Sequence, residues 1–517
     1  MGSGNSGKVL MVLLAVCSAL LAACGGKIQY KPAPGSTIFE RMRNTNYEVK
    51  ITFPGWENWL DEDKVVKAFN DRLAKMGYPG LKIKLDGLDW GSWTDRANAI
   101  VLSGGDYDLV FSPDWGNFYN DAKGGGAWQP WDPFIDQVPE FAALIEPWRD
   151  AIGEYMGYDP DVKHIYRMIT IKEYASYLCE ARWNRNVADK LGITQALRNV
   201  KSLADLEPYM EMYKKAYPNN GMAIVAPDTD PLVSCFMPNA SMFKPSFDLS
   251  IGKFRTGVFS AWFDQYVAQT RSWYAKGYIP DYEQTESYDD LIRKFGPESF
   301  LVYFNVGKPG GEEELNQNSK DLNGFLWGCT YLTKAYITLG SLMSNSWAIN
   351  SRSRNPEATA FVYMLLETDR GLTNLLNFGI EGVHYTMDNT STMVKTADSS
   401  RYFPNLMWMF GNRFLCNRLP GEPENLAQLY EDFNQNAILL PDFGFQWPTD
   451  LSVWKGVDTD MFWGVYGAIT TQYKRSIQTG TITDSQIADI RTKLTQANSQ
   501  GMDRVLNKAF DEWKSPK

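Results

Sequence analysis

Histidine is scarce in this chain, and several common catalytic motifs are missing. Only two histidines occur in 517 residues, His164 and His384, and neither stands in a recognisable serine- or cysteine-hydrolase context. The six cysteines include no C-x-x-C pair, so the sequence indicates neither a zinc site nor a redox motif. We expect no metal and no other cofactor, with a structural calcium among the loops left open.

Positive charge and long apolar runs are also in short supply. The chain has 51 Lys and Arg against 61 Asp and Glu, a formal net charge of −10, which argues against nucleic acid as a partner. Beyond the N-terminus no apolar run is long enough to cross a bilayer. We therefore expect an exported or anchored protein rather than an integral membrane protein.

The N-terminus reads "GKVLMVLLAVCSALLAACGG". Its apolar run, residues 9–21, is too short for a permanent membrane span and has the length of a signal peptide. "LAAC" resembles the bacterial lipobox, in which cleavage leaves a diacylated N-terminal cysteine, here Cys24. We expect a signal peptide over 1–23 and a lipidated tether over 24–46; a plain signal peptide with a chance cysteine is the alternative.

Four cysteines, Cys179, Cys235, Cys329 and Cys416, would remain in the folded part of the chain. In an oxidising compartment they allow three disulfide pairings, and they are equally consistent with small buried hydrophobic side chains, which we favour.

Aromatic residues are abundant, with 18 Trp, 27 Tyr and 27 Phe. Such a surplus of tryptophan indicates a surface that grips something flat and apolar. A sugar ring is a ligand of this kind, because it offers apolar C–H faces to aromatic rings and hydroxyls to carboxylates and amides.

Residues 47–115 alternate between strand and helix patterns, which predicts a parallel, doubly wound sheet. We expect a helix over 93–106, capped near Thr94 or Asp95. Such sheets bind ligands beyond the carboxyl ends of their strands. The candidate ligand-binding residues just past those ends are Trp56, Glu57, Asp89, Trp90, Trp93, Asp114 and Trp115.

Further along, residues 203–218 have helical periodicity, residues 255–295 are expected to be helical, and Asn355 and Pro356 open another helix. The last 65 residues predict two or three helices. Aromatic and polar candidates in this half of the chain are Asn345, Trp347, Trp408, Trp447 and Trp454.

Four stretches resemble a known family: "YNDAKGGGAWQPWDPFID", "NRNVADKLGI" with the helix that follows it, "TDRGLTNLLNFGIEGVHY" and "QGMDRVLNKAFDEWK". They are similar to segments of the extracellular solute-binding proteins of ABC importers, in the large lipoprotein subgroup typified by LipO-like proteins with a C-terminal domain of unknown function. The resemblance implies a periplasmic-binding-protein-like type II fold, in which two α/β lobes joined by a multi-strand hinge close on a ligand. Glu173 and Tyr174 are further candidate ligand-binding residues, in the expected crossover strand where related proteins place a carboxylate at the hinge.

On this resemblance, residues 47–170 and 335–385 form the first lobe, and residues 171–334 and 386–517 form the second, with the C-terminal helices. We expect a monomeric, lipid-anchored protein on the extracytoplasmic face of the cell membrane. It would capture a carbohydrate, an oligosaccharide, and deliver it to the permease subunits of an ABC transporter. It would not be an enzyme. The alternatives are a surface glycan-binding lipoprotein without a transport role, a glycoside hydrolase, and a peptide or lipid carrier.

The segment "NFGIEGVHYT" places Glu381 three residues before His384, a spacing that puts two metal ligands on one face of a helix. Gly379 and Gly382 argue against a helix here, so we expect the preceding helix to end near Asn377 or Phe378. Glu381, His384 and Tyr385 are then candidates for hinge hydrogen bonds or for the cleft edge.

Overall fold

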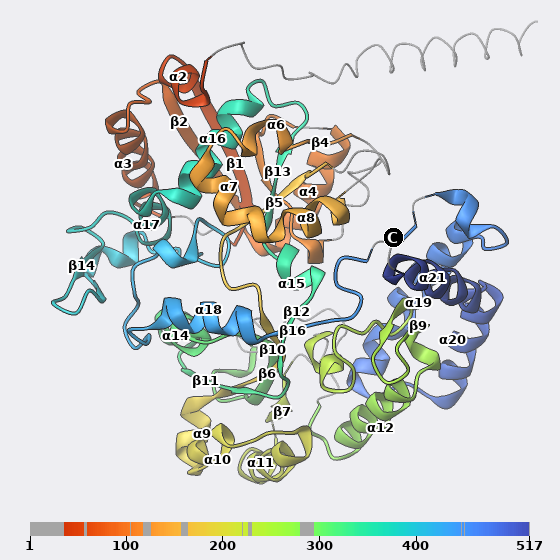
Figure 1. The fold of residues 1–517 in the computed structure, drawn as a ribbon. Coiled ribbons are helices and arrows are strands. Elements are labelled where there is room, and N and C mark those ends of the chain that lie inside the picture. The colour runs from red at the N-terminus through yellow and green to blue at the C-terminus, as the bar shows by residue number, and fades with distance from the viewer. Residues whose placement is uncertain are drawn as a thin grey trace, which may run out of the picture.

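The computed structural model describes residues 36–55, 59–103, 105–116, 126–156, 164–219, 221–225, 230–279, 294–445, 447–448 and 450–515. Two six-stranded sheets organise these residues into two α/β lobes. In Figure 1 the first lobe lies at the top, and the second lies below it with the C-terminal helices gathered at the right. The expected α/β fold class with two lobes is confirmed.

The first sheet has the order β2-β1-β3-β13-β4, with β5 also paired to β13. The first three strands are parallel, as their sequence pattern predicted, whereas β13 enters antiparallel between β3 and β4. All five residues of β13 are buried, as a central strand requires. The strands are β1 (Tyr47–Pro54), β2 (Leu81–Leu88), β3 (Leu109–Phe111), β4 (Trp128–Gln129), β5 (Arg167–Ile169) and β13 (Ser346–Asn350).

Helices cover this sheet with their apolar faces inward. Asn355 caps α16 and Pro356 begins it, as predicted. Helix α4 begins at Trp90, earlier than expected, because the carboxylate of Asp89 accepts a hydrogen bond from the Ser92 N–H (3.0 Å). The helices are α2 (Ile38–Arg43), α3 (Glu62–Lys75), α4 (Trp90–Ser103), α6 (Asp132–Ile135), α7 (Pro139–Ile145), α8 (Arg149–Met156), α15 (Leu339–Met343), α16 (Pro356–Thr368) and α17 (Arg370–Phe378). A hairpin of β14 (Tyr385–Met387) and β15 (Met393–Lys395) follows.

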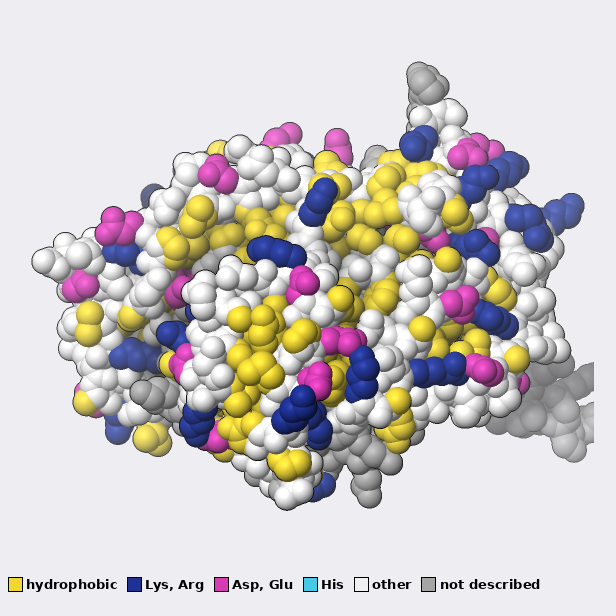
Figure 2. All heavy atoms as spheres, turned by 90° about the horizontal axis from the view of Figure 1, so that it is seen from below, with side chains coloured by type: hydrophobic (Ala, Val, Ile, Leu, Met, Phe, Trp, Pro, Cys, Tyr) yellow, Lys and Arg dark blue, Asp and Glu magenta, His cyan; other side chains and the backbone are white. Residues whose placement is uncertain are grey.

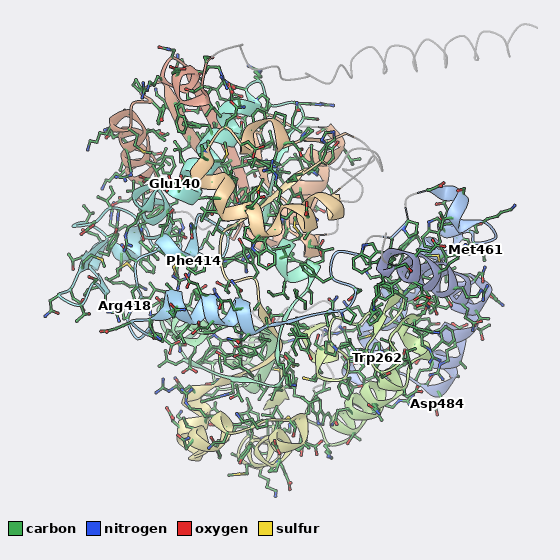
Figure 3. All side chains as sticks on the ribbon, in the orientation of Figure 1. Glu140, Trp262, Phe414, Arg418, Met461 and Asp484 are labelled. Carbon is green, nitrogen blue, oxygen red and sulfur yellow. The ribbon has the colours of Figure 1, made fainter. Side chains whose placement is uncertain are left out.

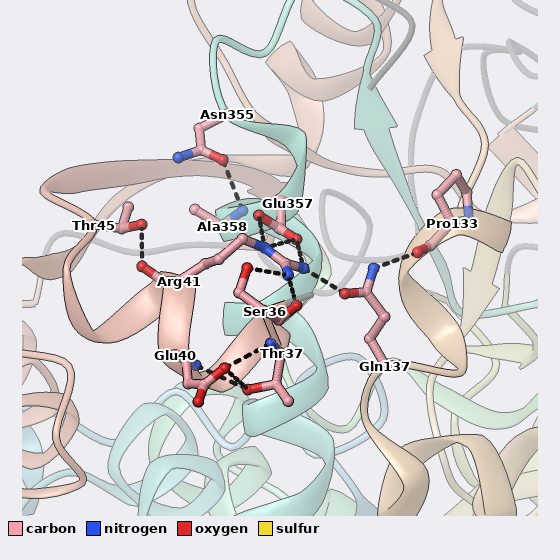
Figure 4. Close-up of polar contacts among 10 residues, drawn as sticks. All are labelled: Ser36, Thr37, Glu40, Arg41, Thr45, Pro133, Gln137, Asn355, Glu357 and Ala358. Atoms are coloured by element: carbon pink, nitrogen blue, oxygen red, sulfur yellow. Dashed lines mark hydrogen bonds and ion pairs between the residues drawn. The ribbon is translucent and has the colours of Figure 1, made fainter. Parts of the chain in front are cut away.

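The first described helix, α2, is fastened to the first turn of α16 (Figure 4). Arg41 Nε donates to Glu357 Oε1 and Oε2 at 3.0 and 3.2 Å, and the Arg41 guanidinium also contacts Gln137 and Ser36. The Glu357 side chain is only 5% exposed, so this ion pair replaces the water that the carboxylate lost on burial. The start of the folded chain is thereby attached to the core of the first lobe.

The second sheet has the order β16-β12-β6-β10-β7, with β11 also paired to β6. Strand β6 is antiparallel to β10, β11 and β12, while β7 runs parallel to β10 and β16 runs parallel to β12. The strands are β6 (Ser176–Asn184), β7 (Met222–Ile224), β10 (Phe300–Gly307), β11 (Trp327–Tyr331), β12 (Ala335–Ile337) and β16 (Ile438–Leu439), with a separate hairpin of β8 (Pro245–Asp248) and β9 (Lys253–Thr256).

The C-terminal helices pack on the core of this second lobe, where Ile477, Leu494 and Leu506 are fully buried. Three helices occupy the last 65 residues, as predicted, and part of the expected helical region 255–295 forms α12, although residues 280–293 lie outside the described residues. The helices are α9 (Arg185–Leu191), α10 (Thr194–Arg198), α11 (Leu203–Ala216), α12 (Ala261–Ala275), α14 (Gly311–Asn323), α18 (Leu426–Asn436), α19 (Thr459–Thr479), α20 (Asp484–Gln496) and α21 (Ser499–Lys514).

Three segments carry the chain between the two sheets. Residues 170–175 connect β5 to β6, residues 338–345 connect β12 to β13 through α15, and residues 416–425 lead from the first lobe to α18. We call these the crossing segments. The chain returns to the first lobe for longer than we predicted, since Leu406, Met409 and Phe410 pack in the core around the first sheet.

Six charged side chains gather where the crossing segments meet; we call them the hinge cluster. They are Lys172, Glu173, Lys308, Glu314, Arg413 and Glu422. Lys308 Nζ lies 3.3 Å from Glu173 Oε1 and 2.9 Å from Glu314 Oε2, and Lys172 Nζ lies 3.4 Å from Glu173 Oε1. Arg413 pairs with Glu422. The cluster contains three cations and three anions, so its formal charges cancel.

Burial makes these ion pairs important. The side chains of Glu173, Arg413 and Glu422 are at most 3% exposed. Burial by itself would raise the pKa of Glu173, but Lys308, Lys172 and Arg413 outweigh that effect and lower the pKa to about 2. Glu173 is therefore ionised at neutral pH. Its negative charge is compensated by Lys172 on the same crossing segment and by Lys308 and Arg413 from other segments.

Glu367, on α16, is a second buried acid beside the same crossing segment. Its Oε2 accepts a hydrogen bond from the Ile171 N–H (3.1 Å), and the residue is 0% exposed. Burial raises the pKa of Glu367 to about 8, against the opposing effect of the Ile171 N–H and of Tyr363. In contrast to Glu173, no cation among the described residues offsets the effect of burial on Glu367, so its side chain is protonated at neutral pH.

The face of the molecule seen from below carries both signs of charge, with Lys and Arg side chains beside Asp and Glu and hydrophobic side chains between them (Figure 2). Ion pairs in the second lobe, such as Arg198–Glu312 at 2.7 Å, are of this kind. Positive and negative side chains are therefore interspersed on this face.

Replacing Glu173 with Gln should destabilise the protein by about 3–5 kcal/mol, because Lys172 loses its carboxylate partner and Lys308 keeps only Glu314. Urea unfolding followed by circular dichroism measures the change. Glu211→Gln is the matched control: Glu211 pairs with Lys215 on the surface of α11, at 58% exposure, so its loss should cost less than about 1 kcal/mol. Equal losses in the two variants would contradict a dominant role for the hinge cluster.

Glu367 should make the protein less stable as the pH rises. Its folded pKa of about 8 lies above its ordinary value of 4.5, so the folded state keeps a proton that the unfolded state releases between these pH values. Glu367→Gln should match the wild type near pH 5 and exceed its free energy of unfolding at pH 8.5 by on the order of 4 kcal/mol. A difference that does not change with pH would refute the assignment; Glu512→Gln, on the exposed face of α21, is the control.

Candidate functional site

Three tryptophans from separate segments meet at the carboxyl edge of the first sheet; we call them the first platform. Trp90 begins α4, Trp115 lies in the 3-10 turn after β3, and Trp408 comes from the returning chain. Trp90 stacks on Trp408 with ring centroids 6.0 Å apart and planes inclined by 16°, and it lies 6.1 Å from Trp115. Trp90 is 54% exposed and Trp115 is 48% exposed, so the platform presents aromatic surface to solvent.

The strands of the first sheet hold this platform in place. Phe111, at the end of β3, contacts Trp115 and Trp408 at centroid distances of 6.1 and 5.8 Å. Gly55, directly after β1, has φ +76°, and a Cβ on it would lie 3.1 Å from the indole of Trp90. Glycine therefore allows the backbone to approach the tryptophan closely at this position.

Two carboxylates flank the first platform. Asp89 precedes Trp90 and is exposed, with its oxygens engaged by Ser92 as the cap of α4. Asp114 precedes Trp115, and its Oδ1 lies 3.4 Å from Nη2 of the fully buried Arg167. Trp115 Nε1 donates to the Ser344 carbonyl (2.9 Å). The structure thus brings together four of the predicted residues from the strand ends, Asp89, Trp90, Asp114 and Trp115, and adds Trp408.

A second group of tryptophans, which we call the second platform, lies on the second lobe. Trp447 stacks on Trp463 with centroids 5.8 Å apart, and Trp454 lies 6.3 Å from Trp447. Trp463 is 40% exposed, whereas Trp454 is 7% exposed and donates its Nε1–H to the Pro448 carbonyl (2.8 Å). Figure 3 labels Met461, at the right of the molecule. Met461 lies in the first turn of α19 and is 47% exposed, so it presents an apolar side chain to solvent.

Trp463 was not among the predicted residues. The helical pattern could have indicated it, because Phe462 and Ile469 face the core of the second lobe and the next residue, Trp463, therefore lies on a different side of α19. An outward-facing tryptophan next to a buried residue on an amphipathic helix is a candidate for binding.

Several predicted ligand-binding residues are buried. Trp347 is 1% exposed and donates its Nε1–H to the Met409 carbonyl (3.0 Å), so it supports Phe111 from below rather than offering a ring to solvent. The other predicted residues with less than 7% exposure are Trp93, Asn345, Glu173 and Tyr174. Trp56 and Glu57 lie outside the described residues, so their assignment stays a prediction.

The "NFGIEGVHYT" segment is a loop, as predicted, because α17 ends at Phe378 and Gly379 has φ +83°. His384 is 0% exposed: its Nδ1 accepts from the Ile380 N–H (2.8 Å) and its Nε2 lies 3.4 Å from Asp61 Oδ2. Glu381 is exposed while His384 and Tyr385 are buried, so Glu381 and His384 do not share a face. The histidine fastens this loop to the start of α3.

Within the described part of the chain no group of three or more His, Cys, Asp or Glu side chains is arranged to hold a metal ion. The four cysteines there are thiols, and burial raises the pKa of Cys416 to about 12. The same residues contain no helix that is long and apolar enough to span a bilayer. The first platform itself consists of aromatic rings beside carboxylates.

No protein-family model matches the chain. No curated protein matches it either. Several solved structures, in contrast, are similar to it in fold. The N-glycan transport solute-binding protein NgtS of Streptococcus pneumoniae, in complex with Man1GlcNAc, superposes with a TM-score of 0.72 at 18% identity, over 90% of this chain and 99% of that one.

Two further structures share the architecture. The alginate-binding protein AlgQ2 has a TM-score of 0.58 at 16% identity over 90% of this chain and 98% of its own. The ABC-transporter substrate-binding protein FusA of S. pneumoniae, in complex with kestose, has 0.55 at 15% identity over 91% and 100%. The chain therefore has the periplasmic-binding-protein-like type II fold of the ABC-transporter solute-binding proteins.

Proposed function

We propose that this protein is an extracytoplasmic solute-binding protein that captures a carbohydrate between its two lobes and delivers it to the permease of an ABC transporter. The observation that carries the proposal is the first platform, where exposed tryptophan rings stand beside carboxylates at the carboxyl ends of the parallel strands of the first sheet. Flat aromatic faces suit the C–H faces of sugar rings, and carboxylates suit their hydroxyls.

The fold and the solved structures similar to it support the same proposed function. NgtS, AlgQ2 and FusA are described as binding a mannose–N-acetylglucosamine glycan, alginate and kestose respectively. The two tryptophan platforms, one on each lobe, favour a ligand of more than one ring, because a single sugar needs one or two aromatic contacts. We propose an oligosaccharide as the ligand, with Asp89, Trp90, Asp114, Trp115 and Trp408 on the first lobe and Trp447, Trp454 and Trp463 on the second.

The residues at the platform support a binding role rather than a catalytic one. Asp89 caps a helix and Asp114 is paired with a buried arginine, so both carboxylates already have structural partners. Glycoside hydrolysis needs an acid and a nucleophile or base placed across the scissile bond. Incubation of the protein with a panel of glycans, including Man1GlcNAc and kestose, should release no reducing ends. Their release would favour the hydrolase alternative.

Trp90→Ala should weaken glycan binding by about tenfold or more, because it removes the central ring of the first platform. Quenching of tryptophan fluorescence on titration with a glycan panel, including Man1GlcNAc and kestose, measures the affinity. Trp513→Ala is the matched control, since Trp513 is 41% exposed on α21 and lies outside both platforms. A protein that responds to peptides and to no glycan would refute the carbohydrate assignment.

Lipid anchoring is a separate part of the proposal, carried by "LAAC" in the sequence. Cys24→Ala should move the protein from the membrane fraction to the soluble fraction, because diacylation supplies the two chains that stable anchoring needs. Cys17→Ala, which changes a cysteine within the signal peptide, should leave the protein with the membranes. A Cys24→Ala variant that stays membrane-bound would contradict the anchor.

A further inference from the structure

A groove of about 450 Å³ lies on the second lobe, beside the crossing segments. Helix α18 forms one wall, strands β12 and β16 form the other, and the turn between β10 and α14 closes one end. Figure 1 shows α18 alongside β12 and β16. None of the residues that line the groove belongs to either tryptophan platform.

The α18 wall carries hydrogen-bonding groups. Asp432 and Asn436, four residues apart, lie on one face of the helix and are exposed. Asp432 Oδ1 accepts from Gln428 Nε2 (2.9 Å), and Asn436 Nδ2 donates to the Asp432 carbonyl (2.7 Å). These contacts use one atom of each side chain, so the Asp432 Oδ2 and the Asn436 Oδ1 can still accept hydrogen bonds from a ligand.

The opposite wall carries a cation. Lys334 precedes β12 and is exposed, and within the described part of the chain its ammonium group forms no hydrogen bond or ion pair. The groove therefore offers an ammonium group on one side and a carboxylate and an amide on the other. Groups of this kind recognise a ligand that both donates and accepts hydrogen bonds, as a sugar hydroxyl does.

Apolar surface completes the groove. Leu429 and Ile438 line it, and Ile438 is 39% exposed. Tyr177 forms part of the floor, where it stacks on Tyr331 with ring centroids 3.9 Å apart. The volume falls within the range of about 300–1,000 Å³ typical of small-molecule sites, which combine an apolar lining with a few polar groups.

From these features we infer that the groove is a second carbohydrate-binding site, which holds a sugar residue between Lys334 and the Asp432–Asn436 face of α18. Leu429 and Ile438 face the C–H side of the ring, while Lys334, Asp432 and Asn436 bind its hydroxyls. The inference stands on the groove alone and does not require that the first platform bind a glycan.

The groove lies beside residues that connect the two lobes, so its occupant can affect how the lobes are held relative to each other. Phe433, on its α18 side, packs with Ala175 of a crossing segment and with Ile337, at the end of β12, in one small apolar cluster. Trp148, from the first lobe, packs against the same cluster. A ligand that draws α18 and β12 together therefore acts on residues that connect the lobes, and it can bias their relative position.

The test follows the methyl NMR signal of Ile438 during titration with mannose, N-acetylglucosamine and Man1GlcNAc. We expect a saturable shift with at least one of these sugars. We expect the double variant Lys334→Met/Asp432→Asn to weaken that response by about tenfold or more, because the ammonium donor is lost and the charged carboxylate acceptor becomes a neutral amide. The matched control is Lys244→Met/Asp511→Asn, which changes an exposed lysine and a surface helical aspartate elsewhere on the second lobe.

The same titration in Trp90→Ala separates this site from the first platform. No tryptophan lines the groove, so the Ile438 shift should persist in Trp90→Ala even where the fluorescence response is lost. An Ile438 signal that does not move with any of the three sugars would overturn the inference. So would a shift that is equally strong in Lys334→Met/Asp432→Asn.

Discussion

The buried ion pairs of the hinge cluster constrain the rest of the molecule, because they lie where the chain passes between its two sheets. Charges with so little solvent access are tolerated only when each has its partner in place, and removal of one partner leaves the other unpaired. Glu173 on a crossing segment, Lys308 at the end of β10 and Arg413 on the returning chain depend on one another in this way. The cluster therefore specifies how the second lobe is attached to the first.

That attachment also determines the first platform. Strand β13 arrives through a crossing segment and inserts into the first sheet, where Trp347 packs under Phe111 and bonds to the carbonyl of Met409. Phe111 and the Met409 region in turn support Trp115 and Trp408. The first platform thus depends on a part of the chain that comes after strands of the second lobe in the sequence. This dependence is what a two-lobed receptor needs if ligand binding is to be coupled to lobe position.

Local sequence pattern was a good guide to the elements and a poorer guide to the site. The strand and helix periods of residues 47–115, the Asn355–Pro356 helix start and the end of α17 at Gly379 all depend on neighbouring residues, and the structure confirms them. Which tryptophans reach solvent depends on packing between distant segments. Trp90 and Trp93 are three residues apart on one helix, yet one is half exposed and the other is buried, because Trp93 meets Phe111 of the sheet. Trp408 was predicted as a binding residue of the second lobe, and the structure places it on the first platform instead. This position could not be predicted locally, since the returning chain delivers the residue.

The most direct test of the carbohydrate-receptor account is a crystal structure of the protein with the oligosaccharide that it binds most tightly. We expect a sugar ring on the face formed by Trp90, Trp115 and Trp408, with hydroxyls near Asp89 and Asp114, and with the second lobe closed over the same ligand. A structure with no sugar ring on the first platform, or with a ligand there that the second lobe does not contact, would contradict the proposed function.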